Sequence, residues 1–422
     1  MTRTLRWHQI ARLGLVQMAL GGVVVLTTST LNRLMVVELA LPAVLPGLLV
    51  ALHYGIQITR PHWGFRSDAR GGRTPFVIGG MAALAAGGIA AAWGVSLMEG
   101  SFAAGLTVSI LAYALIGLGV GASGTSLLAL LAGATAPRHR AAAAMTTWLM
   151  MILGIALTAG LIGALIDPYT PARLMAVVAA TCAAALALTV LAIHGVERSV
   201  TEVRAPEPAS FREGLGEVWA EPEARAFTLF VFLSMTAYFM QELILEPFAG
   251  LVHGLTPGAS TQLSGMQNGG VFVGMLAVGL LASGLRVGSL RGWVVAGCLG
   301  SAGALAALAS GAPLIPATVA LGVFNGMFAV AAIGSMMQLA GEGRSRREGT
   351  RMGLWGAAQA IAAGFGGLAG AAGVDALRLA LPDTAAFGAV FAAEGALFLA
   401  AALMAARTIR PAPASPSLVP GE

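Results

Sequence analysis

The sequence has few charges, few cysteines and no lysine. Only 10 % of its 422 residues are charged, whereas a soluble domain carries about 25 %, so a water-soluble globular class is excluded. Cys182 and Cys298 both fall within apolar runs, which argues against a disulfide framework or a cysteine-based metal site. All 24 basic residues are arginine and the net charge is +5. In so apolar a chain we expect no nucleic-acid partner.

Motifs for nucleotide or metal chemistry are also missing. The chain has no P-loop, no H-E-x-x-H and no C-x-x-C. Gly119-Val-Gly121-Ala-Ser-Gly124 does fit G-x-G-x-x-G, but it lies inside an apolar run with no preceding strand. Close packing of helices through small residues is the better interpretation. We therefore predict no enzyme and no catalytic residues.

Long apolar stretches dominate what is present. Hydrophobic residues make up 57 % of the chain. Helices satisfy their own backbone groups inside lipid, and a helix of about 20 residues crosses a hydrocarbon core. The sequence thus predicts an all-α membrane protein with twelve transmembrane helices, at 10–31, 39–60, 75–96, 104–131, 142–165, 174–194, 225–247, 264–285, 292–311, 316–340, 352–373 and 385–406.

Arginine is distributed unevenly between the two sides of this predicted bundle. With the N-terminus in the cytoplasm, 21 arginines fall on cytoplasmic segments, and only Arg33, Arg173 and Arg378 fall on the opposite side. Positive residues concentrate on the cytoplasmic side of membrane proteins. The sequence therefore predicts a multi-pass protein whose N- and C-termini are both cytoplasmic.

A hydrophilic stretch divides the apolar runs into six and six. We predict an N-terminal six-helix half at 1–194, a cytoplasmic linker at 195–223, a C-terminal half at 224–410 and a disordered tail at 411–422. Two six-helix halves are the internal repeat of the major facilitator fold. Within the linker, Ser210-Phe-Arg-Glu213 fits a capping box and predicts a short amphipathic helix on the membrane surface.

A short basic loop is predicted between the second and third runs. It reads Gly64-Phe-Arg-Ser-Asp68-Ala-Arg70-Gly71-Gly-Arg73. Glycine permits the positive φ values of tight turns, and Asp68 can accept hydrogen bonds from helix-end N–H groups. The pattern resembles the G-x-x-x-D-x-x-G-R motif of major facilitator proteins, which implies a cytoplasmic latch between helices.

The second half does not repeat this motif. Its equivalent stretch at 284–288 reads Gly-Leu-Arg-Val-Gly and lacks the acid. We therefore expect latching between the two halves to be asymmetric.

One group of polar residues lies in the second run, where polar side chains are costly in lipid. His53, Gln57 and Arg60 share one helical face at i, i+4 and i+7. A neutral His53 donates with one ring nitrogen and accepts with the other. Gln57 is expected to accept the donated N–H and so orient the ring. Hydrogen bonding to a neighbouring helix is one interpretation of His53.

Acidic residues in other runs form a second group. Glu242 and Glu246 lie one turn apart, and Pro247 directly after them is predicted to break the helix. We predict a functional or gating site here, with Gln267 and Asn268 at the same depth. Buried acids such as these serve either as hydrogen-bonding contacts between helices or as proton-coupling sites. Glu394 and Asn325 are further polar residues inside later runs. Arg33 and Glu38 flank the first outer turn and are expected to pair.

Three blocks resemble one family. The first comprises Leu31-Asn32-Arg-Leu-Met-Val-Val-Glu38-Leu39, Leu52-His53-Tyr-Gly-Ile-Gln57 and Arg60-Pro-His-Trp-Gly-Phe-Arg-Ser-Asp68. The second is Met240-Gln-Glu-Leu-Ile-Leu-Glu-Pro-Phe-Ala-Gly250, and the third is Gly353-Leu-Trp-Gly-Ala-Ala-Gln-Ala360. Together they resemble the PucC-like proteins of phototrophic bacteria, the bacteriochlorophyll-delivery branch of the major facilitator superfamily. The His-Tyr and Arg-Pro-His-Trp-Gly versions are most similar to members associated with bacteriochlorophyll synthase genes.

The resemblance implies a function in assembly of the photosynthetic apparatus. Such a protein binds or delivers bacteriochlorophyll, or a late precursor, while light-harvesting and reaction-centre complexes form in the bacterial inner (cytoplasmic or intracytoplasmic) membrane. The implied partners are membrane lipid, light-harvesting subunits and bacteriochlorophyll synthase. The resemblance also implies that His53 is axial to the pigment magnesium, within a pigment-binding set of Asn32, Glu38, His53, Gln57, Glu242, Glu246 and Phe248.

Two other functions stay open. A proton-coupled secondary transporter of a small solute would use the same fold and place its coupling sites at Glu242, Glu246 and Glu394. A third possibility is an adaptor that only docks enzymes or antenna subunits.

Overall fold

The computed structural model describes residues 4–69, 72–136, 139–200, 219–284, 287–342 and 348–409. In these ranges eleven helices are long and apolar enough to cross a membrane, and Val44–Thr59 is a shorter apolar helix, which confirms the all-α prediction. The helices are α1 (Trp7–Val25), α2 (Val44–Ile56), α3 (Arg60–Ala69), α4 (Thr74–Met98), α5 (Phe102–Ala134), α6 (Arg140–Ile166), α7 (Pro171–Ile193), α9 (Pro222–Leu251), α10 (Pro257–Val278), α11 (Leu290–Ala309), α12 (Leu314–Glu342), α13 (Glu348–Arg378) and α14 (Asp383–Thr408).

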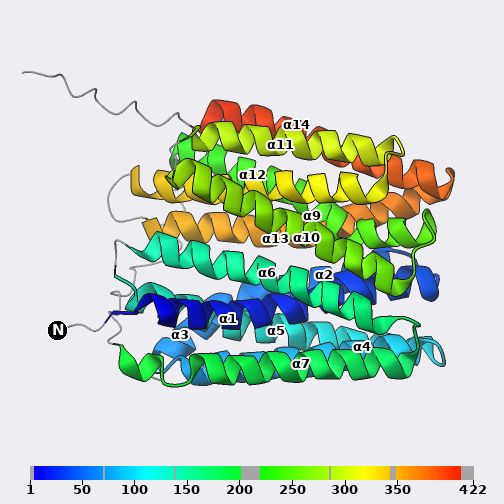
Figure 1. The fold of residues 1–422 in the computed structure, drawn as a ribbon, viewed down its shortest axis with the longest axis horizontal. Coiled ribbons are helices and arrows are strands. Elements are labelled where there is room, and N and C mark those ends of the chain that lie inside the picture. Colours follow the sequence, from blue (N-terminus) through cyan, green and yellow to red (C-terminus); the bar gives the residue numbers. More distant parts are fainter. Residues whose placement is uncertain are drawn as a thin grey trace, which may run out of the picture.

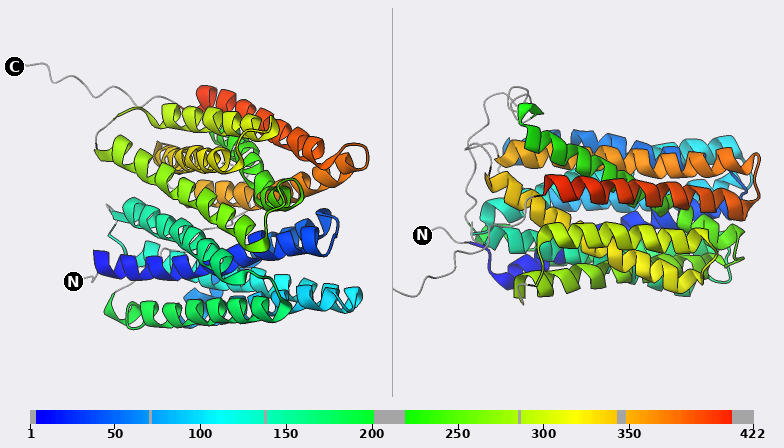
Figure 2. Two further views of the ribbon diagram at one scale, coloured as in Figure 1. Left: turned by 45° about the vertical axis from the view of Figure 1, so that its right-hand side comes forward. Right: turned by 90° about the horizontal axis from the view of Figure 1, so that it is seen from above.

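The helices form two bundles that follow the chain order. Figure 1 shows α1 to α7 on one side and α9 to α14 on the other, and the two further views in Figure 2 agree. One buried apolar cluster takes its residues from 5–196 with Leu243 added, and a second takes them from 227–409 with Ile152 added. The two six-helix halves predicted from the sequence are thus present, each with its own core. The predicted linker helix and tail lie outside the described residues.

The two ends of the bundle are named here by their arginine content. At the arginine-rich end α1 begins at Trp7, α4 begins at Thr74 and α14 ends at Thr408. At the arginine-poor end α4 ends at Met98 and α14 begins at Asp383. This division matches the alternation of the predicted spans.

The first predicted span ends later than expected. α1 continues into two π-helical segments, Leu26–Leu31 and Leu34–Glu38, and α2 then starts at Val44 instead of residue 39. The expected boundary at 31 was wrong because Arg33 and Glu38 were taken as loop charges, whereas they pair inside the helix. A π-helix has wider turns and leaves some carbonyls without their usual partners. Tyr113 donates from its hydroxyl to one of them, the Thr27 carbonyl, at 3.2 Å.

The predicted basic loop is mostly helical, which corrects the sequence interpretation. After a 3-10 turn at Gln57–Thr59, α3 runs from Arg60 to Ala69 and includes Gly64 and Asp68. Pro61 causes no break, because a proline at the start of a helix removes a donor that has no helical partner there. Arg70 and Gly71 lie outside the described residues. The connection between α3 and α4 is therefore only a few residues long.

Small residues let neighbouring helices approach closely, as predicted for the glycine motif in the fourth run. A Cβ on Gly119 of α5 would lie 2.7 Å from the Gly80 carbonyl of α4, so a larger residue would separate these helices. A Cβ on Gly117 would likewise lie 2.7 Å from the His53 carbonyl of α2. This close contact fixes the depth at which α2 presents His53.

Candidate functional site

A run of buried hydroxyl residues lines the first π-helical segment and was not singled out from the sequence. Thr27, Thr28, Ser29 and Thr30 are each at most 3 % exposed. Ser29 donates to the carboxylate of Glu246 on α9, in the other half of the molecule. Four consecutive hydroxyl residues inside an apolar run are the signal that would have found them. π-Helical turns are frequent at functional sites.

Glu246 is the centre of a polar cluster between the halves. It is 2 % exposed, and Thr261 of α10 donates to its Oε2 at 3.3 Å while Ser29 donates to its Oε1. Thr30 Oγ1 lies 3.4 Å from Thr261 Oγ1, which extends the cluster back to α1. Of the two amides expected beside the acids, Asn268 instead donates to the Ser264 carbonyl of its own helix.

Glu242 lies one turn from Glu246 toward the arginine-rich end and is half-buried. Thr28 is its hydrogen-bonding neighbour, and its carboxylate lies within electrostatic reach of the Tyr54 and Tyr238 phenols. Tyr54 belongs to α2 and packs edge-on against Phe239 of α9, with ring centroids 5.9 Å apart. The cluster around Glu246 therefore continues to α2 through an aromatic contact between the halves.

Pro247 does not break the helix, which corrects a second prediction. It lies inside α9, which continues to Leu251. A proline has no N–H for the carbonyl four residues earlier, and that carbonyl belongs to Leu243. Asn32 donates to it from Nδ2 at 2.8 Å. The side chain of the first span thus replaces the missing backbone donor, and the helix continues.

Glu38 and Phe248, which also belong to the predicted pigment-binding set, contact other residues than Glu246. Arg33 pairs with Glu38, as predicted, and its Nη2 donates to the Leu255 carbonyl of the other half at 2.7 Å. Phe248 is 5 % exposed and packs on Phe387 and Phe391, with ring centroids at 5.5 and 5.1 Å. The structure therefore brings Asn32 and Glu246 together, but it places Phe248 in the core of the C-terminal half.

His53, Gln57 and Arg60 form a hydrogen-bonded row along α2 and α3. Gln57 Oε1 accepts from Arg60 Nη2, so its amide nitrogen faces His53 Nε2 at 3.0 Å. An amide nitrogen only donates, so the ring nitrogen accepts, the reverse of the direction expected from the sequence. His53 is 2 % exposed and its Nδ1 is buried with no partner among the described residues.

This row bears on the prediction that His53 ligates magnesium. When Nε2 accepts from Gln57, the proton of the neutral ring sits on Nδ1. Neither nitrogen then has a free lone pair for a metal. Axial ligation would require the Gln57 amide to turn away, and it stays a prediction.

Two carboxylates join the halves reciprocally at the arginine-poor end. Asp167, directly after α6, accepts from Gly258 N at 3.1 Å and from Thr256 Oγ1 at 2.5 Å at the start of α10. Asp375, in the last turn of α13, accepts from Ala43 N at 3.0 Å and Val44 N at 2.7 Å at the start of α2. Helix N-termini favour negative charge. Each half thus caps a helix of the other.

These caps are symmetric and lie at the end opposite the basic loops, for which asymmetric latching stays a prediction. The sixth helix after a given span is its repeat-equivalent, so the fifth and eleventh spans correspond, as do the second and eighth.

The nearby Tyr169 phenol contacts Glu99, and burial followed by the charges of Glu99 and Glu38 raises the pKa of Tyr169 to about 12. The phenol therefore stays protonated and can donate at this end.

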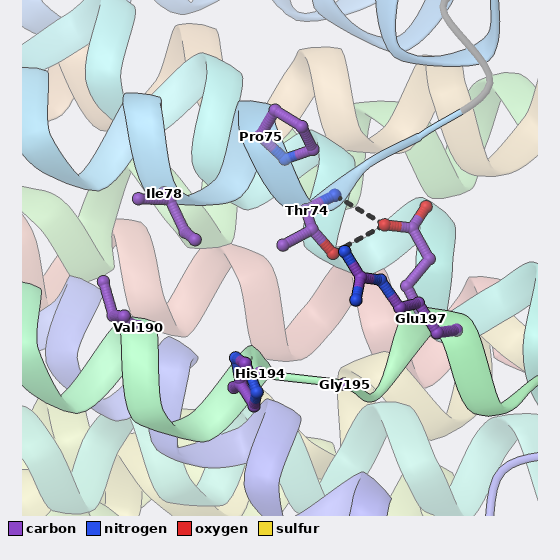
Figure 3. Close-up of a pocket in the computed structure, with 8 residues that line it drawn as sticks. Thr74, Pro75, Ile78, Val190, His194, Gly195 and Glu197 are labelled. Atoms are coloured by element: carbon purple, nitrogen blue, oxygen red, sulfur yellow. Dashed lines mark hydrogen bonds between the residues drawn. The ribbon is translucent and has the colours of Figure 1, made fainter.

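At the arginine-rich end, a carboxylate that was not predicted caps α4. Glu197 accepts from Arg73 N at 2.6 Å. It also accepts from Thr74 N at 2.8 Å and from Thr74 Oγ1 at 2.5 Å (Figure 3). This is the helix-end contact that the motif suggested for Asp68. The Arg73 guanidinium donates to Ser67 of α3 at 3.2 Å. Glu197 also lines a surface groove between α4 and α7, whose walls include Ile78 and Val190.

Glu394 lies apart from the interface, in the core of the C-terminal half. It is 0 % exposed, and its two oxygens have no hydrogen-bond partner among the described residues. A Cβ on the adjacent Gly395 would lie 3.6 Å from the Ala302 carbonyl of α11. Ser301 next to it donates to Asn325 at 2.8 Å. Both interpretations of Glu394, helix contact and proton site, stay open.

Comparisons with known proteins agree with this architecture. The PUCC protein family matches residues 30–412. The Rhodobacter capsulatus protein named "Bacteriochlorophyll synthase 44.5 kDa chain" is 64 % identical over 427 residues, which cover 99 % of this chain and 100 % of that one. "Protein PucC" of Cereibacter sphaeroides is 30 % identical over 424 residues, which cover 93 % and 90 %.

Solved structures confirm the fold alone. A bacterial homologue of the human lysosomal transporter Spinster, inward-facing and occupied, aligns with a TM-score of 0.70 at 15 % identity over 96 % of this chain and 98 % of that one. A mutant of the peptide transporter POT with alafosfalin aligns with a TM-score of 0.69 at 16 % identity over 97 % and 98 %. The chain belongs to the PUCC protein family, as a photosynthesis-related, multi-span membrane protein with a transporter-like helical fold.

Proposed function

We propose that this protein binds a bacteriochlorophyll-type pigment, or a late precursor, between its two halves and hands it on during assembly of light-harvesting or reaction-centre complexes. The observation that carries this proposal is a row of polar side chains that reaches from one half of the molecule to the other. It runs from Arg60, Gln57 and His53 past Tyr54 to Glu242 and the cluster around Glu246. The name of the 64 % identical relative supports a link to this pigment.

The physical chemistry of the pigment fits such an interface. A tetrapyrrole with a long hydrocarbon tail partitions into lipid, so its site needs mostly apolar walls and few polar groups. Tyr54 and Phe239 provide aromatic surface from opposite halves. The magnesium of the pigment is a hard cation that accepts oxygen or imidazole ligands, and His53 and the two acids are the groups of that kind along the row.

Orientation and the lack of catalysis are part of the proposal. The excess of arginine at one end supports placing that end in the cytoplasm of an inner membrane. The word synthase in the relative's name belongs to that protein. Here the protein acts with a pigment-synthesising enzyme or with antenna subunits and performs no bond-forming step itself.

Co-purification tests the proposal. The protein is purified from a host that makes bacteriochlorophyll and from the same host blocked in pigment synthesis. We expect near-stoichiometric near-infrared absorbance only in the first preparation. If a monodisperse preparation from the first host carries no chlorin, pigment binding is ruled out.

A proton-coupled transporter of a small solute is the second candidate, and one observation favours it. Glu246 is a buried carboxylate that contacts both halves, through Ser29 and Thr261. Protonation there would alter the contact between the halves. In proteoliposomes this function requires solute-dependent proton flux that Glu246→Gln abolishes, whereas the pigment-binding function requires none.

A further inference from the structure

Arg60 is exposed, but it does not lie on the outward-facing side of its helix. Gly55, Ile58 and His62 form the exposed face of α2 and α3, and Ile58 is 79 % exposed. At about 100° per residue, Arg60 lies on the opposite face, together with the buried His53 and Gln57. Its exposed surface therefore lies on the face of α2 and α3 that carries His53 and Gln57, and not on the face that carries Ile58.

Arg60 directly follows the apolar helix Val44–Thr59, at the arginine-rich end of a membrane-crossing segment. A charged group at the end of such a segment needs water or a hydrogen-bonding partner. Among the described residues, only Gln57 hydrogen-bonds to it, and that bond uses Nη2. That bond takes one of the two Nη2 hydrogens, so one edge of the guanidinium, with two adjacent N–H groups, remains for a ligand.

The neighbours of Arg60 indicate the shape and polarity of the rest of the ligand. Tyr54 lies within electrostatic reach of Arg60, and with Tyr238 and Phe239 it forms a set of half-buried rings from both halves. Half-buried rings next to an oriented guanidinium suit a flat apolar body that carries an anionic group. A guanidinium binds a carboxylate through two parallel hydrogen bonds, and Gln57 holds the guanidinium in place for that contact.

We propose that Arg60 is the anchor for a carboxylate of the cargo, so that the interface takes a flat macrocycle with a free acid group in preference to its ester. This inference rests on the proposed function and narrows it to the acid form of the pigment. Gln57 is then a positioning residue, and His53 supports Gln57 through the 3.0 Å contact of their nitrogens.

The test uses metal-free probes, so that magnesium ligation does not contribute. The full-length protein in phosphatidylcholine nanodiscs is titrated with pheophorbide a, a chlorin with one free carboxylic acid, and with its methyl ester. We expect the acid to bind about tenfold more tightly, the effect of one hydrogen bond to a charged group. Arg60→Gln should remove the preference, Arg60→Lys should retain part of it, and Gln57→Leu should reduce the acid-to-ester ratio.

Arg66→Gln is the matched control, because Arg66 is an exposed arginine on the same helix α3. It should leave the acid-to-ester ratio unchanged. Equal binding of acid and ester to the unmodified protein overturns the anchor and leaves pigment binding intact. Binding of neither probe counts against the proposed function itself. If Arg60→Gln and Arg60→Lys both lose binding of the acid and of the ester, Arg60 has a structural role. If the preference for the acid disappears in phosphatidylglycerol nanodiscs, the site binds lipid phosphate.

Discussion

Asn32 donates to the one carbonyl that Pro247 leaves without its helical partner, that of Leu243, at 2.8 Å. The two residues lie in different halves of the molecule. The contact therefore does two things at once, because it keeps α9 continuous and joins α9 to the first span. It also places the π-helical segment of the first span directly beside Glu246.

Asn32→Ala is expected to destabilise the protein by about 1–3 kcal/mol, the cost of a buried carbonyl without a donor. Pro247→Ala restores a backbone N–H at position 247, which can bond to the Leu243 carbonyl. The same Asn32→Ala change should therefore cost much less in the Pro247→Ala background. Thermal unfolding of the four variants in detergent forms a double-mutant cycle. Strictly additive losses would show that Asn32 stabilises something else.

Glu246→Gln should lower antenna absorbance in cells several-fold. The carboxylate accepts from Ser29 and Thr261, whereas glutamine offers one acceptor and turns a donor toward the other hydroxyl. Glu242→Gln, next along the row, should have an effect in the same direction. Whole-cell near-infrared spectra measure the result. Asp383→Asn, which removes a partly exposed ion pair with Arg378, is the control and should leave the spectra unchanged. Normal spectra in both glutamate variants would refute a functional site here.

Asp167→Asn and Asp375→Asn should each weaken closure at the arginine-poor end, and only the double variant should open it. Either cap alone still holds one helix start of one half to the other half. Spin labels at Ser101 and Leu379, with buried Cys182 and Cys298 replaced, report the separation across this end. A distance distribution that lengthens fully in one single variant would contradict shared closure.

His53→Ala tests whether this imidazole ligates the pigment. If it does, bound bacteriochlorophyll falls or its near-infrared band shifts to the blue, and His53→Asn retains part of the effect. Gln57→Leu frees Nε2 from its hydrogen bond and should then strengthen binding of the magnesium pigment. Unchanged pigment content and spectrum in His53→Ala would leave His53 with its hydrogen-bonding role alone.

Glu197→Ala should lower the free energy of unfolding by about 1–2 kcal/mol, the usual cost of losing a helix cap. Its carboxylate is the acceptor for two backbone N–H groups at the start of α4. Arg198→Gln, at the adjacent position in the same groove, is the matched control. Comparable losses in both variants would point to disruption of the whole segment instead of the cap.

The spans were predictable because an apolar run of sufficient length has few alternatives to a membrane helix. The error at the end of the first span has a physical cause. Arg33 and Glu38 have the composition of a loop, and only the three-dimensional structure shows that they neutralise each other within a helix. The prediction of a loop at 64–69 was wrong for a different reason. Gly64 and Asp68 are poor helix formers, but the helix that begins at Arg60 continues through them.

The candidate site was predictable only in part. Glu242, Glu246 and His53 stand out as polar residues in apolar runs. Pro247 was misread because the compensating donor, Asn32, lies 211 residues before Leu243, whose carbonyl it bonds. Asp167 and Asp375 gave no signal, since an acid at the end of a span is ordinary, and its role depends on which helix begins beside it.

The reciprocal caps make each half of this molecule complementary to a copy of itself. One half presents a carboxylate at the end of its fifth span and the N–H groups of a helix start at its second, and the other half presents the same pair. In a two-fold dimer a contact made once is made twice by symmetry. A single ancestral half with these two features would already dimerise with both bonds formed. Joining two copies into one chain then preserves the interface without any new residue.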